Sequence, residues 1–143
     1  MFLKKSLIRW IFLIFQIDLE KLTSPIGKEE LLSFAFGRVG YKPTKLKNIR
    51  LDFDLCLEKN GKKYVIEIKL YKGKRYLHPE HVEKFLRKAE KRAPGFEKIL
   101  LIDTSRVTKS VRVLESKIEG FRIVDINQVK QLLEKEPVDI LVD

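Results

Sequence analysis

Cysteine, histidine and methionine are nearly absent from this chain of 143 residues, which holds 1, 2 and 1 of them. The single cysteine, Cys56, excludes an internal disulfide and any zinc site built from several cysteines. Glycine (7) and proline (5) are also sparse, and the chain shows no repeat, low-complexity tract or interdomain linker. Cys56 is expected to be a small core residue, and the cytoplasm is the expected compartment.

No apolar run is long enough to span a membrane. The most apolar segment, Leu7 to Ile17, is interrupted by Arg9 and is far shorter than the ~20 residues that a bilayer requires. The pair Lys4-Lys5 before it resembles the start of a signal peptide, but no small-residue cleavage site follows. Three interpretations stay open for this segment: a core helix, a dimer interface, or a membrane-surface anchor. We expect residues 1–22 to form this apolar segment and residues 23–143 to form one domain.

Acidic residues are scarcer than basic ones, 20 against 30, which gives a formal net charge of +10. The excess is uneven, because Lys42 to Arg75 holds eleven Lys/Arg and only four Asp/Glu. Such a charge distribution favours a polyanionic partner, and nucleic acid is the simplest candidate. The apolar share of 44% is typical of a globular protein. Abundant Lys, Glu and Ile with few Asn and Gln resemble the composition of a thermophile protein.

The clearest local pattern is a hairpin over residues 51–70 (LDFDLCLEKNGKKYVIEIKL). Asn60-Gly61 predicts a two-residue type I′ turn, which sets the register of both strands. The opposed pairs are then Lys59–Lys62, Cys56–Val65, Asp54–Glu67 and Asp52–Lys69. One face collects only apolar residues, namely Phe53, Leu55, Leu57, Tyr64, Ile66 and Ile68, so the hairpin is expected to bury that face.

The predicted pair of Asp54 and Glu67 is energetically costly, because directly opposed carboxylates have Cβ atoms about 4.5–5.5 Å apart and destabilise a sheet. A divalent cation would offset this repulsion, and hard oxygen ligands suit Mg²⁺, or alternatively Mn²⁺. Lys69 is expected on the same face. Two carboxylates and a lysine can together bind a metal, activate a water and stabilise charge on a phosphate. The alternative is a solvated strand with cross-strand ion pairs, Asp52–Lys69 and Glu58–Lys63.

The other elements are predicted from capping, turn and periodicity signals. Helices are predicted from Pro25 (with Ser24 as N-cap) to Arg38, from Pro79 to Ala93, over Lys109–Ile118 and over Asn127–Lys135. Besides the hairpin, strands are predicted over Thr44–Ile49, Lys98–Asp103 and Phe121–Ile126. A hairpin first and strand–helix–strand units later predict an α/β fold, with a mixed sheet and helices on both faces.

The order of these elements and their charged residues resembles the PD-(D/E)XK nuclease superfamily. Its signature is a helix that carries a Glu, then a hairpin with Asp on one strand and (Asp/Glu)-X-Lys on the next. Here these residues are Glu29, Asp54 and Glu67-Ile68-Lys69. Residues 26–41 and the hairpin resemble archaeal Holliday-junction resolvases, whereas residues 99–126 look more like Mrr-type restriction endonuclease domains.

The resemblance implies a restriction-endonuclease-like fold and a metal-dependent endodeoxyribonuclease, acting on duplex or branched DNA and expected to be a homodimer. Asp54 and Glu67 would hold Mg²⁺, with the backbone carbonyl of Ile68 as a third ligand. Lys69 would orient the attacking water and balance charge on the scissile phosphate. Glu29 would reach the metal through water, although an acid in the first turn of a helix is also favoured by the helix dipole alone.

Residues that flank this site are candidates for contacts with DNA. Phosphate contacts are expected from Lys47, Lys72, Lys74 and Arg75, unless they only form a solvated basic loop. His81 would belong to the catalytic set by donating to a phosphate or to a water on the metal, unless it is an ordinary surface histidine. Tyr71 and Tyr76 could stack on unpaired bases or cap the core.

The sequence departs from the family pattern at two places, of which only the second, the shorter connection, bears on the preference for four-way junctions. Phe53 stands where the family usually has Pro before the aspartate, and the connection Lys42–Arg50 is shorter than the corresponding resolvase loop. The resemblance covers residues 26–136 and leaves the N-terminal segment outside. The choice between junction and linear DNA, and between DNA and RNA, stays open. Two other functions stay open as well: a catalytically inactive nucleic-acid-binding module of the same fold, and an interaction or membrane-surface protein that acts through the N-terminal segment.

Overall fold

The computed structural model describes residues 25–44, 52–71 and 73–142. They form a five-stranded sheet whose spatial order follows the chain. The strands are β1 (Lys42–Pro43), β2 (Leu55–Lys59), β3 (Lys62–Lys69), β4 (Glu97–Ile102) and β5 (Phe121–Asp125). The first three strands are antiparallel neighbours, and β3, β4 and β5 are parallel. The sheet is therefore mixed, which confirms the predicted α/β fold class.

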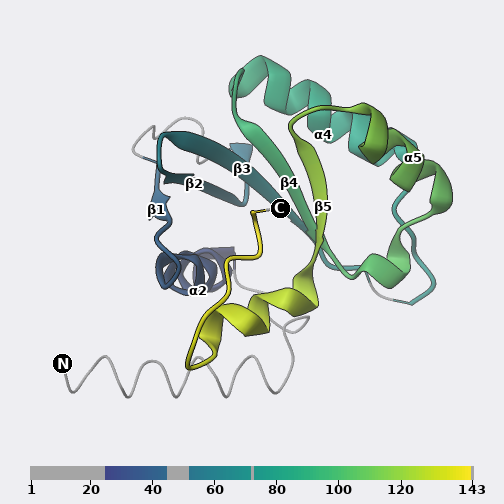
Figure 1. Ribbon diagram of the computed structural model, residues 1–143. Coiled ribbons are helices and arrows are strands. Elements are labelled where there is room, and N and C mark those ends of the chain that lie inside the picture. The colour runs from purple at the N-terminus through teal and green to yellow at the C-terminus, as the bar shows by residue number, and fades with distance from the viewer. Residues whose placement is uncertain (1–24, 45–51, 72, 143) are drawn as a thin grey trace.

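Helices cover both faces of this sheet, as predicted (Figure 1). The helices are α2 (Pro25–Gly37), α4 (Pro79–Arg92) and α5 (Lys109–Lys117), with the 3₁₀ helices η2 (Thr104–Arg106) and η3 (Ile126–Leu133). Helices α4 and α5 connect the parallel strands and lie on one face, whereas α2 and η3 lie on the other. The closing element was predicted as an α-helix but is a 3₁₀ helix. None of the helices in the described part of the chain has the length and apolar character that a membrane span requires.

The sheet is buried on both faces, because successive side chains of a strand point to opposite sides. In β4, Ile99 contributes to the core under α2 and η3, and Leu100 contributes to the core under α4 and α5. The hairpin follows the same rule: Cys56 and Val65 are buried in the core under α4 and α5. The prediction that only one face of the hairpin is buried is therefore wrong, and the prediction that Cys56 is a core residue is confirmed.

The hairpin turn and register agree with the sequence. Asn60 (φ 52°) and Gly61 (φ 81°) both have the positive φ that a type I′ turn requires. The paired residues run from Lys59–Lys62 to Leu55–Ile66, as predicted. Strand β2 begins at Leu55, and the chain bends just before it. The predicted pairing of Asp54 with Glu67 therefore lies beyond the end of the strand ladder.

This bend overturns two predictions made for the start of the hairpin. Phe53 is buried in the core under α4 and α5, on the opposite side from Leu55, because the alternation of a strand does not extend through a bend. The carboxylate of Asp52 lies 3.5 Å from Nε of Arg92, so the predicted ion pair with Lys69 is wrong.

The strand predicted over Thr44–Ile49 is also placed differently. Strand β1 comprises Lys42 and Pro43, opposite Glu58 and Leu57 of β2. Thr44 follows this strand and is buried, and its backbone N–H donates to the carbonyl of Cys56 at 3.0 Å. The rest of the predicted strand lies outside the described residues.

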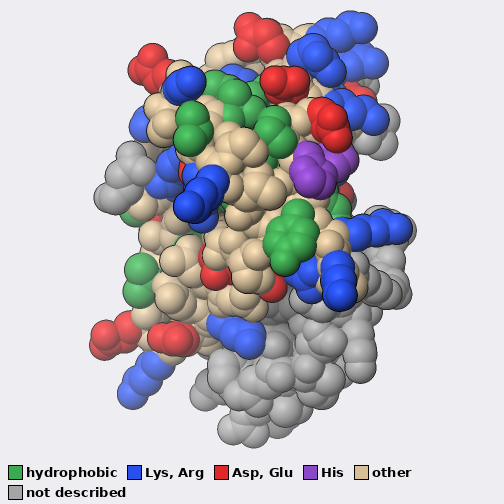
Figure 2. All heavy atoms as spheres, turned by 90° about the vertical axis from the view of Figure 1, so that its right-hand side faces the viewer, with side chains coloured by type: hydrophobic (Ala, Val, Ile, Leu, Met, Phe, Trp, Pro, Cys, Tyr) green, Lys and Arg blue, Asp and Glu red, His purple; other side chains and the backbone are tan. Residues whose placement is uncertain are grey.

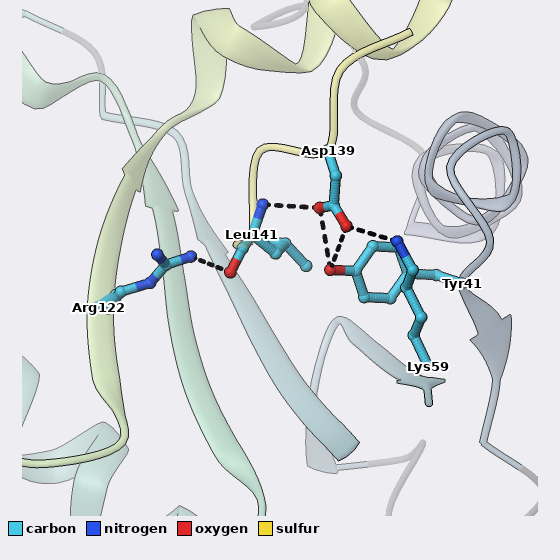
Figure 3. Close-up of polar contacts among 5 residues, drawn as sticks. All are labelled: Tyr41, Lys59, Arg122, Asp139 and Leu141. Carbon is cyan, nitrogen blue, oxygen red and sulfur yellow. Dashed lines mark hydrogen bonds and ion pairs between the residues drawn. The ribbon is translucent and has the colours of Figure 1, made fainter. Parts of the chain in front are cut away.

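The C-terminal segment returns from η3 to the sheet and is held there by polar contacts (Figure 3). Asp139 accepts hydrogen bonds from Tyr41 Oη at 2.9 and 3.0 Å, from Lys59 Nζ at 2.7 Å and from the backbone N–H of Leu141 at 3.0 Å. The guanidinium of Arg122 on β5 donates to the carbonyl of Leu141. These contacts join the last residues of the chain to β2 and the segment before β1 near one edge of the sheet, and to β5 at the other edge. They close the core under α2 and η3.

Candidate active site

Three charged side chains that the sequence analysis singled out meet at the carboxyl end of β3. Glu67 and Lys69 are among the last three residues of β3, and Asp54 lies in the bend that precedes β2. Asp54 Oδ2 accepts a hydrogen bond from the backbone N–H of Ile68 at 2.8 Å. The Asp54 carboxylate is thus fixed against the segment that carries both Glu67 and Lys69. A side chain to backbone contact, rather than a pair of opposed strand residues, brings the three together.

The carboxylate of Glu67 is held by two ammonium groups. Its Oε1 lies 2.6 Å from Lys88 Nζ, and its Oε2 lies 3.7 Å from Lys69 Nζ. The Glu67 side chain is only 16% exposed, so water screens these contacts weakly. The positive charge that the sequence analysis expected from a metal ion is therefore supplied, in this structure, by two lysines.

Lys88 was not identified from the sequence. It lies on α4, three residues after the buried Phe85, and its ammonium also lies 4.9 Å from the ring centroid of Phe53. One signal of its position was present in the sequence: residues three apart on a helix share a face, which places Lys88 beside the buried apolar residues of this helix. That signal does not say which strand the helix packs against, and so it could not connect Lys88 with Glu67.

The oxygen donors at this site fit a divalent ion. The carboxylates of Asp54 and Glu67 and the carbonyl of Ile68 are hard oxygen ligands of the kind that Mg²⁺ and Mn²⁺ prefer. The described residues contain no group of three or more His, Cys, Asp or Glu side chains arranged to hold a metal. An ion with two protein carboxylates is consistent with Mg²⁺ in particular, since Mg²⁺ usually keeps several waters and takes further ligands from a substrate phosphate.

Three other residues of the predicted site lie wholly or partly outside the described part of the chain. Lys47 and Lys72 lie outside it, and so does the side chain of Glu29, whose backbone is in α2. Their proposed contacts with DNA or metal stay predictions.

The loop between β3 and α4 carries the remaining candidates. Lys74 and Arg75 are exposed on this loop, and His81 is exposed in the first turn of α4. Burial raises the pKa of Tyr71; the positive charge of Arg75 opposes this shift, and the negative charge of Glu67 adds to it. The chain's two histidines lie together on this face, with Lys and Arg side chains to either side (Figure 2). The loop therefore adds basic and aromatic groups next to the carboxylates.

The family model Mrr_cat, described as a restriction endonuclease, matches residues 22–133. This range contains every described element from α2 to η3, and therefore the carboxylates, the lysines and the loop described above. No curated protein and no solved structure matches the chain.

Proposed function

Because this chain belongs to the Mrr-type restriction endonuclease family, we propose that it is a metal-dependent endodeoxyribonuclease that uses Mg²⁺, with Mn²⁺ as a substitute. The family makes it a nuclease of the restriction endonuclease-like type, with DNA as the substrate that such nucleases cut. The observation that carries the finer proposal is the contact of Asp54 with the Ile68 backbone, which gathers two carboxylates and Lys69 at one end of β3.

Each residue of this cluster has a role in the proposal. Asp54, Glu67 and the carbonyl of Ile68 would hold the ion. When bound, the ion would polarise the scissile phosphate and lower the pKa of a nearby water. Lys69, whose ammonium already lies 3.7 Å from Glu67, would orient the attacking water and balance the charge that develops on the phosphate. Glu29 would support the ion through a water.

A second candidate function is a module that binds nucleic acid without cutting it. One contact favours it: the 2.6 Å ion pair between Lys88 and Glu67 gives the carboxylate a partner that needs no metal. The Asp54, Glu67 and Lys69 set favours turnover, because a binding protein has no use for carboxylates beside a basic loop that attracts phosphates. The two candidates therefore differ in whether these carboxylates are needed for activity or only for structure.

Cleavage of labelled four-way junction, linear duplex and single-stranded DNA, with Mg²⁺ or EDTA, tests the proposal. We expect cutting only with Mg²⁺, and a decrease in rate of at least about 10²-fold in both Asp54→Asn and Lys69→Ala, since each removes a group that acts on the reacting phosphate or its metal. The preferred DNA would name the substrate class.

Asp52→Asn is the matched control. It removes a carboxylate two residues from Asp54, but Asp52 pairs with Arg92 and not with the cluster. Its cleavage rate should stay within about twofold of the wild type, because neutralising this partly exposed pair costs little. Binding without cutting in the wild type, unchanged by Asp54→Asn and Lys69→Ala, would favour the non-cutting module instead.

We also propose that the nuclease acts as a homodimer, because a single site of this kind hydrolyses one bond at a time, whereas two sites would cut both strands in one encounter. Light scattering on the full chain should then give twice the monomer mass of 16.9 kDa. A monomeric mass under cutting conditions would contradict this.

A further inference from the structure

An open cavity of about 350 Å³ adjoins the catalytic cluster. It is lined by Tyr71, Lys74, Arg75, Tyr76, His78 and His81. Tyr71 connects the cavity with the cluster: it stands two residues after Lys69, and the charge of Glu67 acts on its hydroxyl. A molecule bound in the cavity would therefore lie on the segment of the chain that directly follows the cluster.

The wall of this cavity is held in place although it is formed by an exposed loop. Arg106 on η2 donates to the carbonyls of Gly73 and Arg75, and its guanidinium lies 6.0 Å from the ring centroid of Tyr76. The backbone N–H of Leu77 donates to the carbonyl of Arg106 at 2.8 Å. These contacts fix the loop against η2, so that Tyr76 is presented at a defined position.

The lining combines aromatic surfaces with donors for an anion. The ring centroid of His81 lies 6.5 Å from that of Tyr71 and 5.8 Å from that of His78. His81 Nδ1 accepts a hydrogen bond from the backbone N–H of His78 at 3.2 Å. In the neutral imidazole the proton is then on Nε2, which is left as a donor. Lys74 and Arg75 also line the cavity. The aromatic side chains suit the ring of a ligand, and the cations suit a phosphate.

We propose that this cavity binds one unpaired nucleotide of the DNA strand beside the cut. The inference rests on the proposed function and names its substrate class: DNA that offers an unpaired or extruded nucleotide, in preference to a continuous duplex. A cavity of this size is at the small end of ligand pockets, about 300–1,000 Å³, and admits a nucleotide but not a stacked base pair.

The chemistry of the lining leads to the same substrate. In a continuous duplex both faces of each base are covered by its neighbours, so only an unpaired or flipped base can reach an aromatic wall. Aromatic side chains beside Lys and Arg are how proteins bind single-stranded nucleic acid: the base stacks and the cations hold its phosphate. Tyr76, with 47% of its surface exposed, is the available stacking platform, and Arg75, Lys74 and His81 Nε2 are the phosphate donors.

Binding measured in EDTA, where no metal supports cutting, tests this inference. The probes are a labelled duplex with a single-nucleotide bulge and the same duplex without it. Tyr76→Ala should weaken binding of the bulged DNA about tenfold, because the stacking of one base on the ring is lost, and should leave the continuous duplex within about twofold. With 2-aminopurine as the bulged base, the wild type should quench its fluorescence and Tyr76→Ala should not.

Val113→Ala is the matched control, because it also removes an exposed apolar side chain (51% exposed), from a position on α5 that does not line the cavity. It should change neither affinity. An equal loss for both DNAs in Tyr76→Ala, or no loss for either, would overturn the inference. If the wild type prefers the bulged DNA yet cuts nothing with Mg²⁺, the proposed nuclease function fails and the nucleotide cavity stands. If it cuts but Tyr76→Ala does not discriminate, the cavity proposal fails alone.

Discussion

At the scale of single residues, the contact with the largest consequence is the 2.6 Å ion pair between Lys88 and Glu67. The ammonium binds the carboxylate that the proposed function assigns to the metal ion. Lys88 comes from α4, so it is attached to an element other than the hairpin and can leave Glu67 without moving the strand. Metal binding then becomes an exchange of one cation for another at Glu67.

This exchange makes Lys88→Met a test of metal competition. Methionine keeps the apolar stem that packs near Phe53 but lacks the ammonium that competes for Glu67. We expect the Kd of Mn²⁺, measured by isothermal titration calorimetry without DNA, to decrease about three- to fivefold, which corresponds to about 1 kcal/mol for a partly exposed pair.

The matched control is Lys84→Met on the same helix. Lys84 is exposed one turn before Lys88, and the described structure gives it no ion pair or hydrogen bond. Its Mn²⁺ affinity should equal that of the wild type. A Kd that is unchanged or higher in Lys88→Met would show that the ammonium does not compete with the metal at Glu67.

At the scale of elements, the C-terminal segment is held against the sheet in part by a hydrogen bond from one buried tyrosine, Tyr41. Tyr41 is 2% exposed, and its hydroxyl donates to Asp139, which also binds Lys59 (Figure 3). Burial, together with the hydrogen bond and the negative charge of Asp139, raises the pKa of Tyr41 well above its ordinary value of 10.0. The folded chain therefore keeps this proton at a pH where the unfolded chain loses it.

The stability of the protein should consequently fall above pH 10. There the unfolded state binds fewer protons than the folded state, so the free energy of unfolding decreases with pH, by up to about 1.4 kcal/mol per pH unit for this one group. Below pH 10 its contribution is fully present. In Tyr41→Phe this part of the slope should vanish, and stability at pH 7 should be lower by about 1.5 kcal/mol because a hydrogen bond to a charged group is lost.

Urea unfolding at pH 7, 10 and 11 measures both quantities. Lysines also titrate in this range, and the comparison between the two proteins cancels their contribution. Equal pH slopes for the wild type and Tyr41→Phe would show that the Tyr41 hydroxyl is not held in its protonated form by the fold.

The elements that the sequence predicted correctly are those with a turn, capping or periodicity pattern at each end. The type I′ turn set the register of β2 and β3, and for α2, α4, α5, β4 and β5 the predicted ends lie within about one residue of the observed ones. The errors lie where the backbone departs from a regular period. Phe53 was assigned to the wrong core and Asp52 to the wrong partner because the register was extended through a bend that no residue marks.

The candidate site was only partly accessible from the sequence, for the same reason. Asp54, Glu67 and Lys69 are close in the chain, and a hairpin alone brings them near one another. Lys88 could not be placed, because its contact with Glu67 depends on how α4 crosses the sheet, and that packing is decided by the whole core. The cavity beside it depends likewise on Arg106 of η2, a residue far from the loop in sequence.

At the scale of the whole molecule, the chain's excess of basic residues (net charge +10) includes a pair of cations near each end of β3. Strand β3 begins with the exposed pair Lys62 and Lys63 and ends at Glu67 and Lys69, followed by the loop with Lys74 and Arg75. At about 3.3 Å per residue, the two ends lie about 23 Å apart. The fold thus places one pair of cations beside the candidate active site and an equal pair at the opposite end of β3.

These two pairs allow a test of whether DNA binding depends on the site or on total charge. The double variant Lys74→Ala/Arg75→Ala should reduce the slope of log Kobs against log[salt] for duplex DNA by about 2, because each phosphate contact contributes about 1. Lys62→Ala/Lys63→Ala removes the same charge from the far end of β3 and should leave the slope nearly unchanged. Anisotropy titrations in EDTA at several salt concentrations give both slopes. If the two double variants lower the slope equally, DNA is attracted by the overall charge of the protein, and the loop after β3 has no special part in holding phosphates at the candidate site.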